Sequence, residues 1–350
     1  MGLCPDGAGA QQGYPRFLER GSRSNHGRRT DDPGVAGRHE SGIGGAKALE
    51  EVKIGHVDVK SVMTKSSLPV GGYSVNPYVG CTHACKYCYA SFMKRFTGHT
   101  EEWGTFLDVK HWPEIRNPQR YAGQRVVIGS VTDGYNPQEE QFGNTRKLLE
   151  QLRDSNADIL ITTKSDLVLR DLDLLKELGQ VTVSWSINTL DEDFKNDMDC
   201  AVSIERRIAA MKQVYDAGIR TVCFVSPVFP GLTDFEAIFA RVKNQCDLFW
   251  LENLNLRGGF KKTIMDYIAV KHPGLMPLYN QIYNRHDRSY FEALMRQAEA
   301  MARQYDCPFV DNEMPYGRVP QGHPIIVNYF YHEEIRDSEN TGARHKKEDK

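Results

Sequence analysis

Three cysteines within eight residues carry the clearest chemical signal in the sequence. Cys81, Cys85 and Cys88 stand in the segment "CTHACKYCYA" with the spacing Cys-x3-Cys-x2-Cys. A loop this short can wrap three thiolates around one metal centre. Three protein ligands on a four-iron cluster leave one iron open, and an open position distinguishes a reactive metal site from a closed structural one. The amine and carboxylate of a small molecule could chelate that iron.

Two other interpretations of these cysteines stay open. The first is a zinc site that adds His83 or a distant histidine, and the second is an accident of composition. His83 lies between two of the cysteines, where so close a ligand would strain a tetrahedral site. Structural zinc sites also usually draw paired ligands from two separate turns, and the sequence has no second Cys-x2-Cys. The spacing therefore favours an iron–sulfur cluster.

The elements that must position this loop follow an alternating pattern. Apolar, β-branched segments alternate with amphipathic ones; "SIERRIAAMKQVYDAG", for example, is a helix pattern with a serine cap and a glycine stop. Six such strand–helix units in a row predict a parallel sheet with right-handed crossovers, partly closed into a barrel or doubly wound. The predicted strands cover residues 73–80, 125–131, 157–164, 181–188, 220–228 and 247–256.

Polar side chains follow these strands at the points where they end. The carboxyl edge of a parallel sheet is where α/β folds place their sites. Any single one of these residues could instead be a helix cap or a loop polar residue. The set comprises Ser130, Thr132, Asp133, Thr163, Lys164, Ser186, Asn188, Ser226, Glu252 and Asn253.

Composition sets the class of protein. The 350 residues include 44 Lys+Arg and 46 Asp+Glu, a net charge of −2, and 40% are hydrophobic. These values predict a soluble globular protein and argue against a strongly basic surface for nucleic acid. One tight cysteine cluster does not resemble a disulfide framework, and the first 30 residues lack the apolar run of a signal peptide. We therefore expect a cytoplasmic protein without a membrane span.

Four segments are expected along the chain. Residues 1–50 are glycine-rich and predicted to be disordered, and 55–258 form the core barrel. Residues 259–335 form a mainly helical extension over one open side of the sheet, with a last strand at 325–330. Residues 337–350 form a disordered tail. Aromatic residues of the extension could form a substrate wall or pack in the core.

The cysteine segment resembles the signature of the radical S-adenosylmethionine (SAM) superfamily, including an aromatic residue, Tyr87, before the last cysteine. Further segments, "GSVTDGYNPQEE", "TTKSDLVLRD", "SWSINTLDEDF" and "SPVFPGLTD", resemble in order the branch that contains spore photoproduct lyase. The stretch from about 55 to 335 resembles the uncharacterised family called radical SAM mobile pair protein B.

This resemblance implies a partial six-stranded parallel β/α barrel. It implies a [4Fe–4S] cluster on the three cysteines and S-adenosylmethionine bound across the strand ends. By the same match, Lys164 and Arg207 are expected to bind the carboxylate of SAM, and Thr132, Ser186 and Asn188 its ribose and amino groups. Such donors suit these groups chemically.

The implied reaction is reductive cleavage of SAM to methionine and a 5′-deoxyadenosyl radical, which abstracts hydrogen from an unknown substrate. The resemblance also implies an electron donor such as flavodoxin or ferredoxin, and a paired second radical SAM protein. A nucleic-acid base, a peptide side chain and a small metabolite stay open as substrates. The alternatives are a non-enzymatic zinc-binding interaction module and a pure electron carrier, each using the same cysteines.

One position departs from the lyase pattern, and no catalytic residue is assigned. Ser130 stands where spore photoproduct lyase carries a cysteine as hydrogen donor, and a serine O–H is a poor hydrogen-atom donor. Lyase activity on a DNA photoproduct is therefore not expected. Asp133 and Glu139 of the same segment could orient this loop, touch substrate or form a salt bridge within it.

Overall fold

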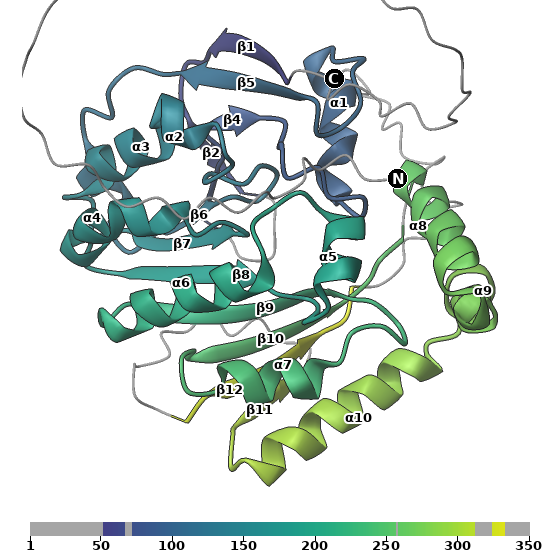
Figure 1. The fold of residues 1–350 in the computed structure, drawn as a ribbon. Helices are drawn as coiled ribbons and strands as arrows, with labels where there is room; N and C mark the ends of the chain where they lie inside the picture. Colours follow the sequence, from purple (N-terminus) through teal and green to yellow (C-terminus); the bar gives the residue numbers. More distant parts are fainter. Residues whose placement is uncertain (1–51, 67–71, 257, 312–323, 333–350) are drawn as a thin grey trace, which may run out of the picture. The chain divides into compact units, whose positions relative to one another are not determined.

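A long, mostly parallel sheet organises the computed structural model, which describes residues 52–66, 72–256, 258–311 and 324–332 (Figure 1). Its strand order is β11-β12-β10-β9-β8-β7-β6-β3-β2. Six neighbouring strands run parallel in the order of the sequence and confirm the predicted β/α units. They are β3 (Tyr73–Val75), β6 (Arg125–Ile128), β7 (Asp158–Thr163), β8 (Val181–Ser186), β9 (Arg220–Val228) and β10 (Leu248–Asn253).

The sheet continues beyond these six strands. The predicted last strand is confirmed as β12 (Ile326–Phe330), which pairs in parallel with β10 and with β11 (Phe309–Asp311). At the other edge, β2 (Met63–Lys65) is antiparallel to β3. The extension therefore adds strands to the barrel sheet as well as helices, a pairing that local sequence pattern does not reveal.

A second, three-stranded sheet was not predicted. Its order is β1-β5-β4, with β1 (Lys53–Asp58) parallel to β5 (Phe106–His111) and β4 (Tyr78–Val79) antiparallel to β5. Strand β4 ends two residues before Cys81. The small sheet therefore supports the start of the cysteine loop.

Helix α6 (Ile204–Asp216) begins and ends where its serine and glycine predict. It is capped by Ser203, whose side chain accepts from the Arg206 N–H, and Gly218 follows it with φ 84°. Asp234 caps α7 (Phe235–Val242) in the same way. The other crossover helices are α2 (Glu139–Phe142), α3 (Asn144–Leu152), α4 (Leu172–Glu177) and α5 (Glu192–Met198), with 3₁₀ turns η2 (Pro118–Tyr121) and η3 (Leu167–Asp171).

The two faces of the sheet differ in chemistry. Strand residues alternate between faces, so Trp185 and Cys223 point into the main core while their neighbours Ser186 and Phe224 point to the other face. The core face is covered by the crossover helices, among them α6 and α7 in Figure 1. The opposite face is the interior of the partial barrel. It carries polar side chains toward the carboxyl ends of the strands.

The C-terminal helices share the main core with the barrel. Phe291 and Leu294 of α10 (Ser289–Gln304) and Tyr283 of α9 (Met276–Arg285) are buried in the same apolar cluster as the strands. Helix α8 (Gly258–Lys271) and the turn η4 (Pro273–Leu275) precede them. The predicted disordered segments, 1–50 and 337–350, lie outside the described residues.

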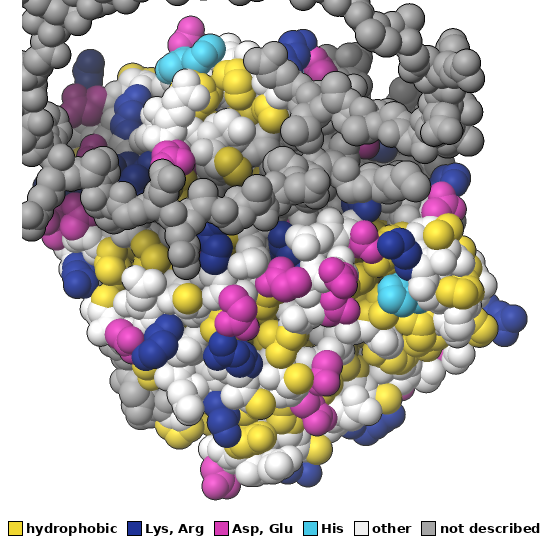
Figure 2. Space-filling view, viewed as in Figure 1, with side chains coloured by type: hydrophobic (Ala, Val, Ile, Leu, Met, Phe, Trp, Pro, Cys, Tyr) yellow, Lys and Arg dark blue, Asp and Glu magenta, His cyan; other side chains and the backbone are white. Residues whose placement is uncertain are grey.

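The distribution of charged side chains and the polarity of the helices can be compared with the composition. On the face shown in Figure 2, basic and acidic side chains are interspersed. None of the helices in the described ranges combines the length and the apolarity that a membrane crossing requires.

Candidate functional site

The cysteine loop joins β4 to the 3₁₀ turn η1 (Tyr89–Met93), which continues into α1 (Lys94–Thr97). Helical structure begins only after Cys88. Two tight turns come first, closed by hydrogen bonds from the Ala84 N–H to the Cys81 carbonyl (3.3 Å) and from the Cys88 N–H to the Cys85 carbonyl (3.1 Å). Each thiol thereby lies within electrostatic range of the other two.

All three cysteines are free thiols in a water-poor setting. Burial raises the pKa of Cys81 to about 12 and raises the pKa values of Cys85 and Cys88 as well. The ammonium group of Lys164 opposes this shift at both Cys85 and Cys88. Because a thiol must lose its proton to bind a metal, cluster assembly here exchanges protons for iron.

A tryptophan beside the loop fits an iron–sulfur cluster. The Trp103 Nε1–H is buried and has no hydrogen-bond partner among the described residues. Trp103 lies beside Cys88. Burial raises the pKa of the Cys88 thiol, and Trp103 partly offsets this increase. Gly104 brings this segment close: its φ is +105°, and a Cβ there would lie 2.4 Å from the Ala84 Cβ. A buried indole N–H next to a cysteine suits a thiolate or sulfide of a cluster.

Within the described ranges, no three His, Cys, Asp or Glu side chains lie close enough together to hold a single metal ion.

Asp133, at the end of β6, orients the loop. Its carboxylate accepts hydrogen bonds from Thr163 Oγ1 (2.8 Å), the Lys164 N–H (2.7 Å) and the Tyr135 N–H (2.9 Å), and it lies 2.9 Å from His83 Nε2. Burial raises its pKa, but His83 and the backbone N–H groups outweigh burial and hold the pKa below its usual value. Of the roles open for Asp133, the contacts support the orienting one.

Glu139 also makes hydrogen bonds that hold neighbouring elements together. Its buried carboxylate accepts from Arg170 (2.6 Å), from the Thr145 N–H (2.8 Å) and from the Tyr78 hydroxyl. These contacts tie α2 to β4 and η3, so they support the salt bridge that was one reading of this residue.

Thr132 and Ser130 connect the β6 end to the cysteine loop. The Thr132 hydroxyl donates to the Gly80 carbonyl at 2.7 Å, directly before Cys81. The Ser130 hydroxyl lies 2.5 Å from Ser74 Oγ and accepts from Asn76 Nδ2 at 3.0 Å. Both hydroxyls therefore have protein partners.

Lys164 extends from the end of β7 toward the cysteines. Burial lowers its pKa, but Cys85 and Asp199 outweigh burial, so the pKa is raised and the ammonium group stays charged. Its Nζ lies 5.6 Å from the centre of the Tyr87 ring. A charged ammonium group next to Cys85 suits an anionic group of a ligand.

Ser186 is the last residue of β8, and Asn188 follows the strand by two residues. Both side chains are buried, and the Asn188 Nδ2–H₂ group has no hydrogen-bond partner among the described residues. Leaving such a donor unsatisfied costs about 1–3 kcal/mol, so a polar ligand is a natural partner.

Arg207 occupies a different setting from the one expected. Its guanidinium is fully buried and donates to Asp199 (2.7 Å), the Val202 carbonyl (3.0 Å) and the Ser186 carbonyl (3.1 Å). These contacts fix Asp199 and the end of β8 beside Lys164. Its predicted contact with the SAM carboxylate stays a prediction.

The sequence analysis did not identify two residues that lie near Cys88, Tyr89 and Trp103. The Tyr89 hydroxyl donates to the Ser130 carbonyl, and the ring lies near both Cys88 and Glu252. Its place directly after the last cysteine could have indicated it. Trp103 lies in a distant loop, and nothing local in the sequence indicated it.

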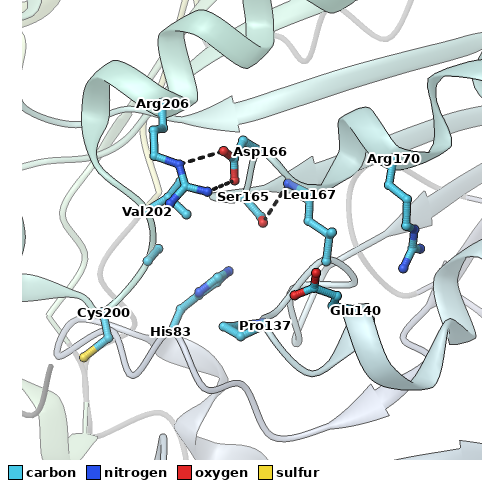
Figure 3. A pocket seen from close by; sticks show the side chains of 11 residues that line it. His83, Pro137, Glu140, Ser165, Asp166, Leu167, Arg170, Cys200, Val202 and Arg206 are labelled. Carbon is cyan, nitrogen blue, oxygen red and sulfur yellow. Dashed lines mark hydrogen bonds and ion pairs between the residues drawn. The ribbon is translucent and has the colours of Figure 1, made fainter. Parts of the chain in front are cut away.

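A pocket of about 370 Å³ lies on the outer side of the cysteine loop (Figure 3). His83 points into it, facing the ion pair of Arg206 with Asp166 (2.7 and 2.9 Å). The lining also includes Arg170 and Glu140. The predicted SAM-binding residues do not line it, so it is distinct from the strand-end site.

Comparison with known proteins agrees with this arrangement. A model of the radical SAM superfamily matches residues 75–241. An uncharacterised protein of Methanocaldococcus jannaschii is 34% identical over 225 residues, 64% of this chain and 85% of that protein. The radical SAM Nα-GlyT isomerase of Pseudomonas phage M6 is 26% identical over 180 residues, 50% of this chain and 36% of that protein.

Solved structures of spore photoproduct lyase share this fold. A mutant with bound AdoMet and dinucleoside spore photoproduct has a TM-score of 0.52 at 16% identity, covering 83% of this chain and 88% of that one. The complex with dinucleoside spore photoproduct has a TM-score of 0.50 at 17% identity, covering 66% and 72%. The narrower resemblance to mobile pair protein B stays a prediction. With the cysteine loop and the ends of five of the six consecutive parallel strands inside the matched region, the chain belongs to the radical SAM superfamily of enzymes, whose cofactors are a [4Fe–4S] cluster and S-adenosylmethionine.

Proposed function

We propose that this enzyme reductively cleaves S-adenosylmethionine and uses the resulting 5′-deoxyadenosyl radical to abstract hydrogen from a substrate held in the barrel. The cluster, when bound, supplies the electron and an open iron for the amine and carboxylate of SAM. The observation that carries the proposal is the meeting of three free thiols, one buried and two partly buried, with the charged Lys164 at the strand ends.

The chain's own residues then divide into two groups. Lys164, Ser186 and Asn188 are proposed to contact SAM, because the ammonium group is charged and the Asn188 amide lacks a described partner. Thr132 and Arg207, each engaged in a 2.7 Å hydrogen bond, are proposed to act mainly by positioning the loop and the β8 end. A reductant such as flavodoxin or ferredoxin would supply the electron. We also propose a second, paired radical SAM protein as a partner.

The test is anaerobic reconstitution with iron and sulfide, followed by dithionite and SAM. We expect 5′-deoxyadenosine from the wild type and from Cys307→Ala, whose partly exposed thiol lies outside the loop. Cys85→Ala should form none. Wild-type yields no higher than those of Cys85→Ala would reject the proposal. One bound zinc without acid-labile sulfide would favour the zinc-binding interaction module instead.

A further inference from the structure

The segment that follows α5 lies directly against the cysteine loop. Two backbone hydrogen bonds, of 2.9 and 2.8 Å, join the loop at Lys86 and His83 to residues 198–200. Between these two contacts, the side chain of Asp199 accepts a hydrogen bond from the Tyr87 hydroxyl at 3.3 Å. Groups that surround the Asp199 carboxylate are therefore close to whatever the three cysteines bind.

A buried lysine lies beside this carboxylate. Lys195 of α5 is 4% exposed, and its ammonium group donates to Asn196 Oδ1 at 3.2 Å and to the Ala201 carbonyl. Its Nζ lies 3.8 Å from Asp199 Oδ1. All three neighbours are acceptors, which suits an ammonium group with its three N–H donors.

The positive charge of Lys195 is only partly compensated. Asp199 Oδ1 lies 2.7 Å from the Arg207 guanidinium, closer than its 3.8 Å separation from Lys195, so one carboxylate serves two cations. Glu192, a second carboxylate within electrostatic range of Lys195, accepts from the backbone N–H of the first residue of α6. Because a buried charge is costly without a counter-charge, a further negative group nearby would stabilise this arrangement.

The cysteine loop can supply that negative charge. Cys85 lies within electrostatic range of Lys195. A four-iron cluster held by thiolates is anionic, and its reduction adds one further negative charge. The ammonium group acts strongly there, because buried surroundings screen charges less than water does. A nearby positive charge stabilises the reduced cluster more than the oxidised one and therefore raises its reduction potential.

We propose that Lys195 is the buried counter-charge of the cluster and that its ammonium group raises the reduction potential at which the cluster takes up its electron. The inference rests on the proposed binding of a cluster by Cys81, Cys85 and Cys88, and it adds a residue that sets how easily this cluster is reduced. Lys164 has a different role, because it is proposed to contact SAM, whereas Lys195 donates to protein acceptors and acts through its charge.

The experiment is an EPR-monitored redox titration of the reconstituted protein without SAM. Lys195→Gln removes the charge and keeps a polar side chain. We expect its equilibrium constant for one-electron reduction to fall at least tenfold, which moves the potential about 59 mV in the negative direction. Lys195→Arg keeps the charge and should restore most of the wild-type potential. Lys212→Gln, which breaks an exposed pair with Asp216 on α6, should titrate as the wild type does.

Equal potentials of wild type and Lys195→Gln, with iron and sulfide content intact in both, overturn the inference. If Lys195→Gln and Lys195→Met both lose the cluster, the cluster content of Lys195→Arg decides. Retention in Lys195→Arg supports the counter-charge, and loss there shows that the position requires the shape of lysine and overturns the inference.

The failure of this inference is distinguishable from that of the proposed function. An unchanged potential together with a normal yield of 5′-deoxyadenosine refutes the role of Lys195 alone. A wild type that assembles no four-iron cluster refutes the proposed function, and the role of Lys195 with it.

Discussion

At the scale of single residues, Trp103 offers the sharpest test of how the protein tunes the cluster. Its buried N–H lies beside the thiol of Cys88. A hydrogen bond to a thiolate stabilises the more negative, reduced cluster and so raises the reduction potential. If that bond is worth about 1.4 kcal/mol more in the reduced state, the effect is about 59 mV for one electron.

Trp103→Phe should therefore make the potential more negative by some tens of millivolts, measured by an EPR-monitored redox titration. Trp112→Phe is the matched control, because the Trp112 Nε1–H donates to Gln151 Oε1 at 3.1 Å on another part of the barrel. An unchanged potential in Trp103→Phe would show that its N–H does not reach the cluster.

Lys164 tests the binding of SAM at the same scale. A charge-assisted hydrogen bond contributes about 1.5–3 kcal/mol, so Lys164→Ala should weaken SAM binding roughly 10- to 100-fold. Isothermal titration of the reconstituted, unreduced protein measures this directly. Lys176→Ala, exposed on α4, should bind SAM as the wild type does. Equal affinities of the two variants would contradict the proposed contact.

At the scale of elements, the close approach of the Trp103–Gly104 segment to the cysteine loop is decisive. An alanine at 104 would be strained at φ +105° and would place its Cβ 2.4 Å from that of Ala84. Gly104→Ala should lower the iron and sulfide content per chain. Gly98→Ala also has positive φ, 73°, but meets nothing within 4 Å, so it should retain full iron and sulfide. Equal cluster content in both variants would show that this packing does not shape the loop.

The buried pair of Asp199 and Arg207 joins the end of α5 to α6. Burial raises the pKa of Asp199, but Arg207, Lys164 and Lys195 outweigh burial and leave it below the usual value. Asp199→Asn leaves a buried guanidinium uncompensated and should cost about 3–5 kcal/mol of unfolding free energy in urea at pH 7.

The pH dependence of that cost follows from the sign of the shift. A carboxylate with a lowered pKa contributes its stability above the unfolded value of about 3.9 and loses it as the pH falls through the lower folded value. The difference in unfolding free energy between wild type and Asp199→Asn should therefore be largest at pH 7 and should decrease below about pH 4. Asp216→Asn, which breaks an exposed pair with Lys212, should cost less than about 1 kcal/mol. A cost for Asp199→Asn no larger than that for Asp216→Asn would contradict this account.

At the scale of the whole molecule, the C-terminal region completes the core. Strand β12 covers the edge of β10, and the ring of Tyr305, just after α10, lies 5.1 Å from Phe239 of α7. A chain that ends at residue 258 would expose this surface. We expect such a chain to lack a cooperative thermal transition, measured by circular dichroism. A cooperatively folded fragment would instead show that the predicted boundary at 258 separates two folding units.

The sequence predicts those parts of this molecule that local pattern specifies. The six parallel strands and the helix cap at Ser203 follow from spacing and side-chain type, whereas the role of the three cysteines as cluster ligands stays a prediction. The pairing of β12 with β10 and the approach of Trp103 to Cys88 depend on contacts between distant segments. Arg207 matched the family pattern, yet its charge is committed to Asp199, which only the packing of α6 reveals.

One measurement tests the central claim most directly: the EPR spectrum of the anaerobically reduced protein before and after addition of SAM. If Cys81, Cys85 and Cys88 hold a four-iron cluster with one open iron, SAM binding at that iron changes the signal. The account predicts a shifted spectrum in the wild type and no four-iron signal in Cys85→Ala. A strong cluster signal that SAM leaves unchanged would contradict the account and identify the protein as an electron carrier.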